Sequence, residues 1–230
     1  MQTVRLHNPL VIGIKECLKQ IFVDNYYADK VIERAFKKNR RWGARDRGIV
    51  AETVYDIVRW WRMLCEVNNL NYEKFEVHTA ALIIQSYFFL YRNQNAEWKD
   101  LPLIDFKHLK QKFDELSKVR VYRESIPDWL DERGVNELGS RWDREIAAQN
   151  GQAPIVIRVN TLKATIEEVQ RELYKKGIET KRTQFSSTGL ILAKRTNLFT
   201  FEIFKKGWFE LQDESSQHVV NLLAFYPVCA

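Results

Sequence analysis

The stretch Pro154-Ile-Val-Ile-Arg-Val-Asn160, followed closely by Thr165-Ile-Glu-Glu168, decides the fold of the second half of the chain. In the first segment aliphatic side chains alternate with Val156, Arg158 and Asn160, and this alternation predicts a strand. In the second segment Thr165 and Glu168 have the spacing of a capping box, which predicts the first turn of a helix. Together the two segments predict a strand that leads directly into a helix.

Shorter signals continue the same pattern towards the C-terminus. Gly177 is the expected end of the helix, strand candidates follow near residues 178–181, 190–193 and 207–211, and a last helix begins near Asp213. Residues 153–230 are therefore expected to form a small α+β subdomain.

The first half of the chain shows helical periodicity only. Asn8-Pro9 is a helix start signal, and the strongest apolar stripe contains Val50, Val54, Ile57, Val58, Trp61 and Leu64. Further helices are expected at 81–91 and 106–116. We predict an all-α domain over residues 1–118 and a helical linker region over 119–152, where two short helices are separated near Gly139.

Positive charge is concentrated in one window of the chain. Residues 30–47 hold eight basic side chains against Glu33 and Asp46, so the window carries a net charge of +6, equal to that of all 230 residues. Such a cluster favours a polyanion as partner, because each neutralised phosphate releases counterions. The alternative is a solvated helix face. The candidate RNA-binding residues here are Arg40, Arg41, Arg45 and Arg47.

Several classes of site are not supported by the sequence. Cys17, Cys65 and Cys229 lie far apart, and the four histidines have no acid at ligand spacing, so we predict neither a disulfide framework nor a metal site. The N-terminus lacks a signal peptide and the longest apolar run is too short to span a bilayer, which favours a cytoplasmic protein without membrane contact. Gly43–Gly48 lacks the Lys and Ser/Thr of a phosphate loop, and we expect no catalytic residue in this chain.

Two further polar groups are candidate sites. Arg158 and Asn160 project from one side of the predicted strand with Lys163 just beyond, an arrangement that can contact RNA phosphates and base edges. An ordinary solvent-facing strand is the alternative. The run Gln212-Asp-Glu-Ser-Ser-Gln217 is typical of a helix N-terminus with Asp213 as its cap, although this explains only part of the run.

In combination these segments resemble the RsmB/Nop/Sun type of RNA cytosine-5 methyltransferase. The resemblance rests on Arg158-Val-Asn160, the helix after Thr165, and Phe204-Lys-Lys-Gly-Trp-Phe-Glu-Leu-Gln-Asp-Glu-Ser-Ser-Gln217. Ala44-Arg-Asp-Arg47, with the Val-Tyr-Asp-Ile-Val-Arg that ends at Arg59, resembles the NusB-like domain of RsmB-type enzymes, and Ser125–Trp129 resembles the entry into the next region. The resemblance implies a NusB-like helical bundle followed by an RRM-like subdomain.

The family implies transfer of a methyl group from S-adenosylmethionine to carbon 5 of a cytosine, with small-subunit ribosomal RNA as partner. Its catalytic cysteines and glycine-rich cofactor loop belong to a Rossmann-like domain expected after Pro227, so this chain is expected to recognise RNA and to be inactive alone. The resemblance also places Gln212, Asp213 and Ser216 at the edge of the cofactor pocket, with a helix cap as the alternative. Two other functions stay open: a stand-alone RNA-binding module resembling an antitermination factor, and a protein–protein scaffold.

Overall fold

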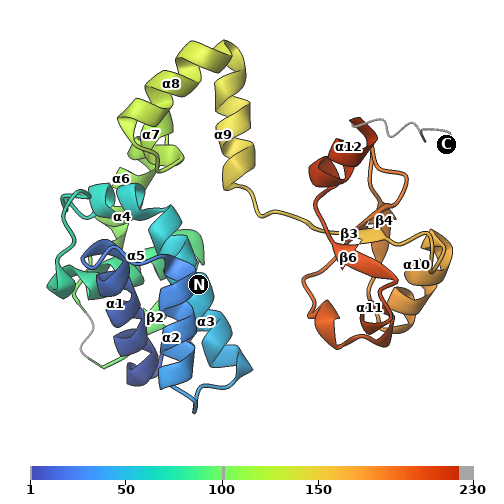
Figure 1. The fold of residues 1–230 in the computed structure, drawn as a ribbon. Coiled ribbons are helices and arrows are strands. Elements are labelled where there is room, and N and C mark those ends of the chain that lie inside the picture. Colours follow the sequence, from blue (N-terminus) through green and yellow to red (C-terminus); the bar gives the residue numbers. More distant parts are fainter. Residues whose placement is uncertain (1, 100–101, 223–230) are drawn as a thin grey trace. The chain divides into compact units, whose positions relative to one another are not determined.

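The computed structural model describes residues 2–99 and 102–222, and the chain divides into two compact units, Met1–Asn150 and Gly151–Ala230 (Figure 1). We call them the N-terminal and the C-terminal unit. The predicted combination of a helical region with a small α+β region is confirmed. Cys229 and the Pro227 segment lie outside the described residues.

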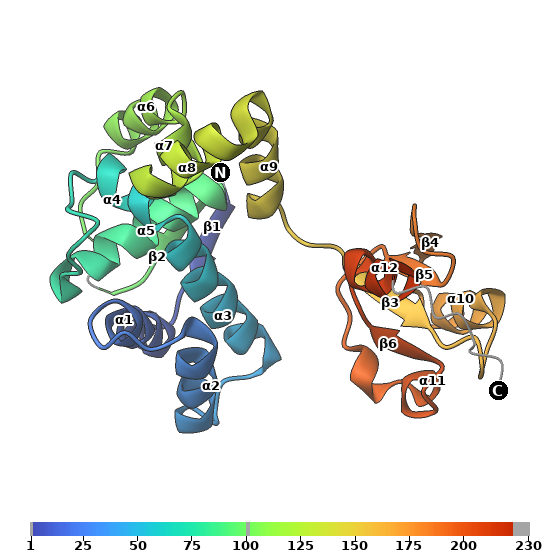
Figure 2. The same ribbon diagram turned by 45° about the horizontal axis from the view of Figure 1, so that its top comes forward.

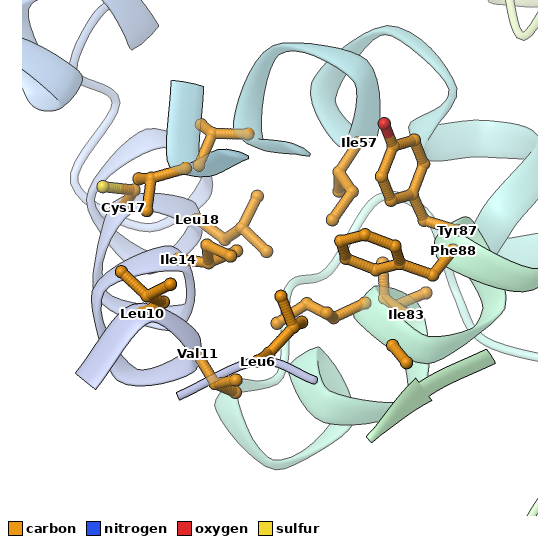
Figure 3. Close-up of a cluster of buried hydrophobic side chains, with 14 of the residues drawn as sticks. Leu6, Leu10, Val11, Ile14, Cys17, Leu18, Ile57, Ile83, Tyr87 and Phe88 are labelled. Atoms are coloured by element: carbon orange, nitrogen blue, oxygen red, sulfur yellow. The ribbon is translucent and has the colours of Figure 1, made fainter. Parts of the chain in front are cut away.

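The N-terminal unit consists mainly of helices, which bury one large apolar core and two smaller apolar clusters. The longer ones are α1 (Asn8–Phe22), α2 (Ala28–Lys38), α3 (Ala44–Arg59), α5 (Ala80–Tyr91), α6 (Phe106–Leu116), α8 (Asp128–Leu138) and α9 (Trp142–Asn150). Shorter are α4 (Trp61–Val67), α7 (Arg120–Arg123) and the 3-10 turns Val77–Thr79 and Gly139–Arg141. Figure 3 shows Leu10, Ile14 and Leu18 of α1 facing Ile57 and Phe88 in this core.

Two details of the N-terminal unit differ from the sequence prediction. The apolar stripe from Val50 to Leu64 is interrupted at Trp60, whose ψ of 19° ends α3 before α4 begins; the Trp60 ring stacks on Tyr91 at 5.0 Å between centroids. The expectation of no strand is wrong, because β1 (Gln2–Arg5) and β2 (Gln94–Glu97) pair in parallel. Both strands are short and polar, so neither shows the apolar alternation that identifies strands in a sequence.

Residues 120–150, which we expected to form a linker region, contact the preceding helices. The buried Arg62 of α4 donates from Nη1 to the carbonyl oxygen of Ile126 at 2.5 Å and from Nη2 to Asp128 Oδ1 at 2.9 Å. Arg59 donates to the carbonyl oxygen of Asn150 at 3.0 Å. In the structure these helices are therefore part of the N-terminal unit, and the division between the units falls after Asn150.

The C-terminal unit has one four-stranded sheet with the order β4-β5-β3-β6, in which all neighbours are antiparallel. Its elements are β3 (Ile155–Val159), α10 (Ile166–Lys175), β4 (Thr180–Arg182), β5 (Gly189–Leu192), a 3-10 turn (Leu198–Thr200), α11 (Glu202–Lys205), β6 (Phe209–Leu211) and α12 (Glu214–Leu222) (Figure 2). Because β5 lies between β3 and β4, the β3-α10-β4 segment is a split β-α-β unit.

Local signals explain much of this unit. The Thr165–Glu168 capping box forms as predicted, and Gly177 has a φ of +71° after α10. Ile157, Val159 and Phe209 are buried in the core. Val156, which we placed on the polar face with Arg158, is only 7% exposed, and α12 contacts β3. The second face of β3 is therefore not open along its whole length.

Candidate nucleic-acid interface

The basic window lies on α2, on the start of α3 and on the loop of residues 39–43 between them (Figure 1). Trp42 anchors this loop: its side chain is 7% exposed, and a methyl group on Gly13 of α1 would lie only 2.4 Å from the indole ring. The ring also meets Phe36 edge-on at 6.4 Å between centroids. Glycine at position 13 thus lets the indole lie directly on α1, which fixes the loop to the helical core.

The anchored loop and the first turn of α3 expose three of the four predicted arginines. Arg40, Arg41 and Arg45 are exposed, and none forms an ion pair within the described part of the chain. Arg45 also lines a polar hollow of about 570 Å³ together with Arg5 and Glu97. Arg47 is different, because it is half-buried with its guanidinium 5.7 Å from the centroid of the Phe36 ring.

Other basic residues of the window are partly neutralised. Lys37 pairs with Glu33 at 2.6 Å and Lys38 with Glu16 at 3.1 Å. Such exposed pairs are weak and screened by salt, but they lower the positive potential along α2. Among the described residues, the exposed arginines of the window without an ion pair are therefore Arg40, Arg41 and Arg45, together with Arg34, whose guanidinium lies over the Tyr26 ring.

The C-terminal unit contains a second hollow of about 570 Å³, at the end of β3 and β6. Three of the predicted residues line it, namely Arg158, Asn160 and Gln212, together with Thr188 and Glu210. The Arg158 guanidinium lies 3.5 Å from Gln212 Oε1. Arg158 is exposed and has no carboxylate within ion-pair distance among the described residues, so its charge is available to an anion.

Asn160 and Lys163 mainly hold the loop that precedes β6. The Asn160 side chain donates to the carbonyl oxygen of Gly207 at 3.2 Å and accepts from the backbone N–H of Leu162 at 3.2 Å. Lys163 Nζ donates to the carbonyl oxygen of Lys206 at 3.0 Å. Gly207 has a φ of +69°, a conformation that favours glycine. Both side chains are thus committed to structural contacts, and their predicted contacts with RNA stay a prediction.

The polar run at residues 212–217 contains two residues whose role the sequence reasoning missed. The carboxylate of Glu214 accepts hydrogen bonds from the backbone N–H groups of Phe185 and Ser186. The buried Gln217 accepts from Ser186 Oγ at 2.6 Å and donates to the carbonyl oxygen of Gln212 at 2.9 Å. These contacts attach the β4–β5 loop to α12. The only signal in the sequence is that the polar run is longer than a helix cap requires.

The charge of Glu214 makes this attachment sensitive to pH. Partial desolvation raises the pKa of its carboxyl, but hydrogen bonds from the backbone of Phe185 and Ser186 outweigh this and hold the pKa below the ordinary value of 4.5. A depressed pKa in the folded state stabilises the protein above the ordinary value, and this stabilisation is lost as the pH falls through the folded-state pKa.

We therefore expect Glu214→Gln to lower the melting temperature of the C-terminal unit at pH 7. The difference from the wild type should begin to shrink below about pH 4.5, where the unfolded wild type binds a proton, and should vanish once the pH has fallen through the lower folded-state pKa, where the folded wild type is neutral as well. Thermal unfolding followed by circular dichroism between pH 3 and 8 measures this difference. The control is Glu202→Gln on α11, which removes an exposed carboxylate that pairs with Lys205. A pH-independent difference for Glu214→Gln would contradict a role for its charge.

The structure also bears on metal ligands, membrane-spanning helices and cysteine thiols. Within residues 2–99 and 102–222, no cluster of three potential metal ligands occurs and no helix is long and apolar enough to cross a membrane. Cys17 and Cys65 are buried in the core, and desolvation, with a smaller contribution from Glu16 and Glu66, raises their thiol pKa to about 11 and about 12. Neither thiol is available as a nucleophile at neutral pH.

The sheet order of the C-terminal unit has a counterpart among known proteins. Residues 126–198, from the start of α8 to beyond β5, match the family described as Methyltr_RsmF/B-like, ferredoxin-like domain. The split β-α-β unit and the sheet order are those of a ferredoxin-like fold. Residues 126–198 thus resemble the ferredoxin-like domain of RsmF/B-like methyltransferases.

Sequence relatives support the same resemblance to rRNA methyltransferases. Ribosomal RNA small subunit methyltransferase B of Pseudomonas syringae pv. tomato is 29% identical over 113 residues, which are 49% of this chain and 25% of that protein. The probable ribosomal RNA small subunit methyltransferase B of Synechocystis is 31% identical over 114 residues, 46% of this chain and 26% of that protein. The resemblance to RsmB-type rRNA methyltransferases is confirmed over about half of this chain, and the match spans about a quarter of the length of these relatives.

One solved structure is similar over nearly the whole chain. The crystal structure of PH0851 aligns with 96% of this chain and 56% of its own length, with a TM-score of 0.57 and 22% identity. At this identity the similarity concerns the fold alone.

Proposed function

We propose that this chain recognises RNA for the methylation of carbon 5 of a cytosine in small-subunit ribosomal RNA. The observation that carries the proposal is the Trp42-anchored loop, which exposes Arg40 and Arg41 without acidic partners among the described residues, in a chain related to rRNA methyltransferases. Arginine guanidinium groups on a fixed loop suit phosphate oxygens in both charge and hydrogen-bond geometry.

The two units contribute to this function in different ways. The N-terminal unit, as a NusB-like helical domain, supplies the phosphate contacts of Arg40, Arg41 and Arg45. The C-terminal unit, as an RRM-like subdomain, supplies Arg158 at the hollow beside β3, and Asn160 and Lys163 shape the loop next to it. Phosphate contacts of this kind position the RNA and carry little sequence information.

The methyltransferase relatives imply S-adenosylmethionine as the methyl donor of the family. Of the three side chains expected at the cofactor pocket, only Gln212 lines a hollow of the described structure, while Asp213 and Ser216 are exposed outside it. The three do not converge on one cavity, so the described residues do not fit a cofactor site by themselves. We derive no step through the cofactor, and a place for these residues at the edge of its pocket stays a prediction.

The double variant Arg40→Glu/Arg41→Glu tests the RNA-binding function. We expect it to weaken binding to a small-subunit rRNA fragment by about tenfold or more at 0.1 M salt, because two phosphate contacts become repulsive. We also expect it to reduce the slope of log K against log salt by about 1 to 2. Filter binding or fluorescence anisotropy across a salt series measures both quantities.

A matched control changes the same charge elsewhere on the N-terminal unit. Arg133→Glu/Arg144→Glu reverses two exposed arginines that lie outside the basic window, beside Glu137 and Glu145, and we expect a much smaller effect on the salt slope. Equal effects of the two double variants would show that RNA senses only net charge. A wild-type chain without salt-dependent RNA affinity would overturn the proposed function and favour a protein–protein scaffold.

A further inference from the structure

The turn between α1 and α2 presents two neighbouring tyrosines to solvent. The Tyr27 side chain is 82% exposed and that of Tyr26 is 47% exposed. The turn itself is well defined: Asn25 has a φ of +56°, and the Tyr26 N–H donates to the carbonyl oxygen of Gln20 at 3.1 Å. Tyr27 is the N-cap residue of α2, and its carbonyl accepts from the N–H of Val31 at 3.0 Å. An exposed aromatic side chain is thus held on an ordered backbone.

The two rings have different surroundings. The Arg34 guanidinium lies over the Tyr26 ring at 4.5 Å from its centroid, a cation–π contact that fixes both side chains. Tyr27 forms no aromatic or cation–π contact within the described residues. The ring of Tyr27 therefore stays open to solvent, next in the sequence to Tyr26, whose own ring is covered by the Arg34 guanidinium.

Basic side chains on α2 lie between this turn and the basic loop. Residues 27, 30, 34 and 37 recur at the spacing of one helix face, and they are Tyr27, Lys30, Arg34 and Lys37. Arg34 is displaced from Tyr27 by about 10 Å along the helix axis. Asp29 lies 3.9 Å from Lys30 and partly neutralises it, so the positive charge available to phosphates begins at Arg34 and continues to Arg40 and Arg41.

We propose that Tyr27 is a stacking site for an unpaired base of a single-stranded RNA segment, whose phosphates continue along Arg34 towards Arg40 and Arg41. The inference rests on the proposed RNA-binding function and names its substrate class, single-stranded RNA. A base can stack on Tyr27 only when its π face is free, and in an A-form duplex that face is covered by the neighbouring base pairs. An aromatic platform next to a positively charged track is the arrangement by which proteins bind single strands.

The test compares Tyr27→Ala with Tyr27→Phe in the full 230-residue chain. Because stacking contributes strongly per base, we expect Tyr27→Ala to weaken binding of a 12-nucleotide single-stranded RNA by about fivefold or more. Tyr27→Phe retains the ring and should bind like the wild type. Binding of the same sequence as a duplex, and of a single strand with abasic sites throughout, should be unchanged by Tyr27→Ala. The salt slope should also be unchanged, because no phosphate contact is removed.

Trp129→Ala provides the matched control for an exposed aromatic side chain. Trp129 is 64% exposed on α8, where Asp128, Asp131 and Glu132 surround it in sequence, and we expect no change in affinity for any RNA. If wild type binds RNA but Tyr27→Ala binds single strands as tightly as Tyr27→Phe does, the stacking site is overturned and the RNA-binding function stands. If wild type binds no RNA, both proposals fail. Equal weakening towards single strand and duplex would also overturn the stacking site.

Discussion

Replacing Trp42 by alanine is expected to lower the free energy of unfolding of the N-terminal unit by about 3–5 kcal/mol. The indole is 7% exposed and packs on the bare backbone of Gly13 and the edge of Phe36. Its removal leaves a void between α1 and the basic loop that the rigid helix cannot fill. Chemical denaturation followed by circular dichroism measures the loss.

The same variant is expected to weaken RNA binding without changing any charge. Arg40 and Arg41 flank Trp42 in sequence, so a loop that has lost its anchor must be ordered again when it binds phosphates. The measurement is made at a temperature where the variant is still folded. Trp129→Ala, which removes an exposed tryptophan from the same unit, should change stability by less than about 0.5 kcal/mol. A destabilised Trp42→Ala protein with unchanged RNA affinity would contradict the need for a preordered loop.

For the basic loop, the sequence predicts where positive charge is concentrated but not which of the charged side chains are exposed and unpaired. The sequence is sufficient to locate the window between residues 30 and 47 that carries a net charge of +6, because net charge is summed over residues that are neighbours in the chain. It does not separate Arg40 and Arg41, which are exposed, from Arg47, whose guanidinium lies over the Phe36 ring. Nor does it reveal that Lys38 pairs with Glu16, which is 22 residues away. These distinctions depend on tertiary contacts.

The C-terminal unit shows the same division between local and distant information. The β3 strand and the capping box of α10 are predictable because their signals lie within a few residues of each other. The loop contacts of Asn160 with Gly207 and of Glu214 with Ser186 join residues 47 and 28 positions apart. A polar residue in a strand or at a helix start gives no sign of such partners, so the sequence does not predict the contact of Asn160 with Gly207.

One buried arginine in α4 helps to join the later helices to the N-terminal unit. Arg62 is 7% exposed and lies 5.0 Å from the ring centroids of both Tyr72 and Tyr122. Its hydrogen bonds to Ile126 and Asp128 reach across more than 60 residues. The sequence places Arg62 next to Trp61 of the apolar stripe but gives no indication of these partners, so it predicts a linker region over residues 119–152.

We expect Arg62→Ala to lower the free energy of unfolding of the N-terminal unit by about 3 kcal/mol, because a buried charge-assisted hydrogen bond and two cation–π contacts are lost. Arg62→Met, which restores most of the volume but not the hydrogen bonds, should recover part of the loss. Arg133→Ala, which removes an exposed arginine paired with Glu137, should change stability by less than about 0.5 kcal/mol.

The location of the loss is more informative than its size. Hydrogen exchange should increase first in α8 and α9 of Arg62→Ala, while α1 and α3 stay protected, because Arg62 connects the later helices to α4. Limited proteolysis should cleave between residues 117 and 127 more rapidly than in the wild type. An increase in exchange spread evenly over the whole N-terminal unit would mean that α8 and α9 are held by their other contacts, such as Arg59 with Asn150. Arg62 would then stabilise the helical core as a whole, and the attachment of these helices would not depend on it.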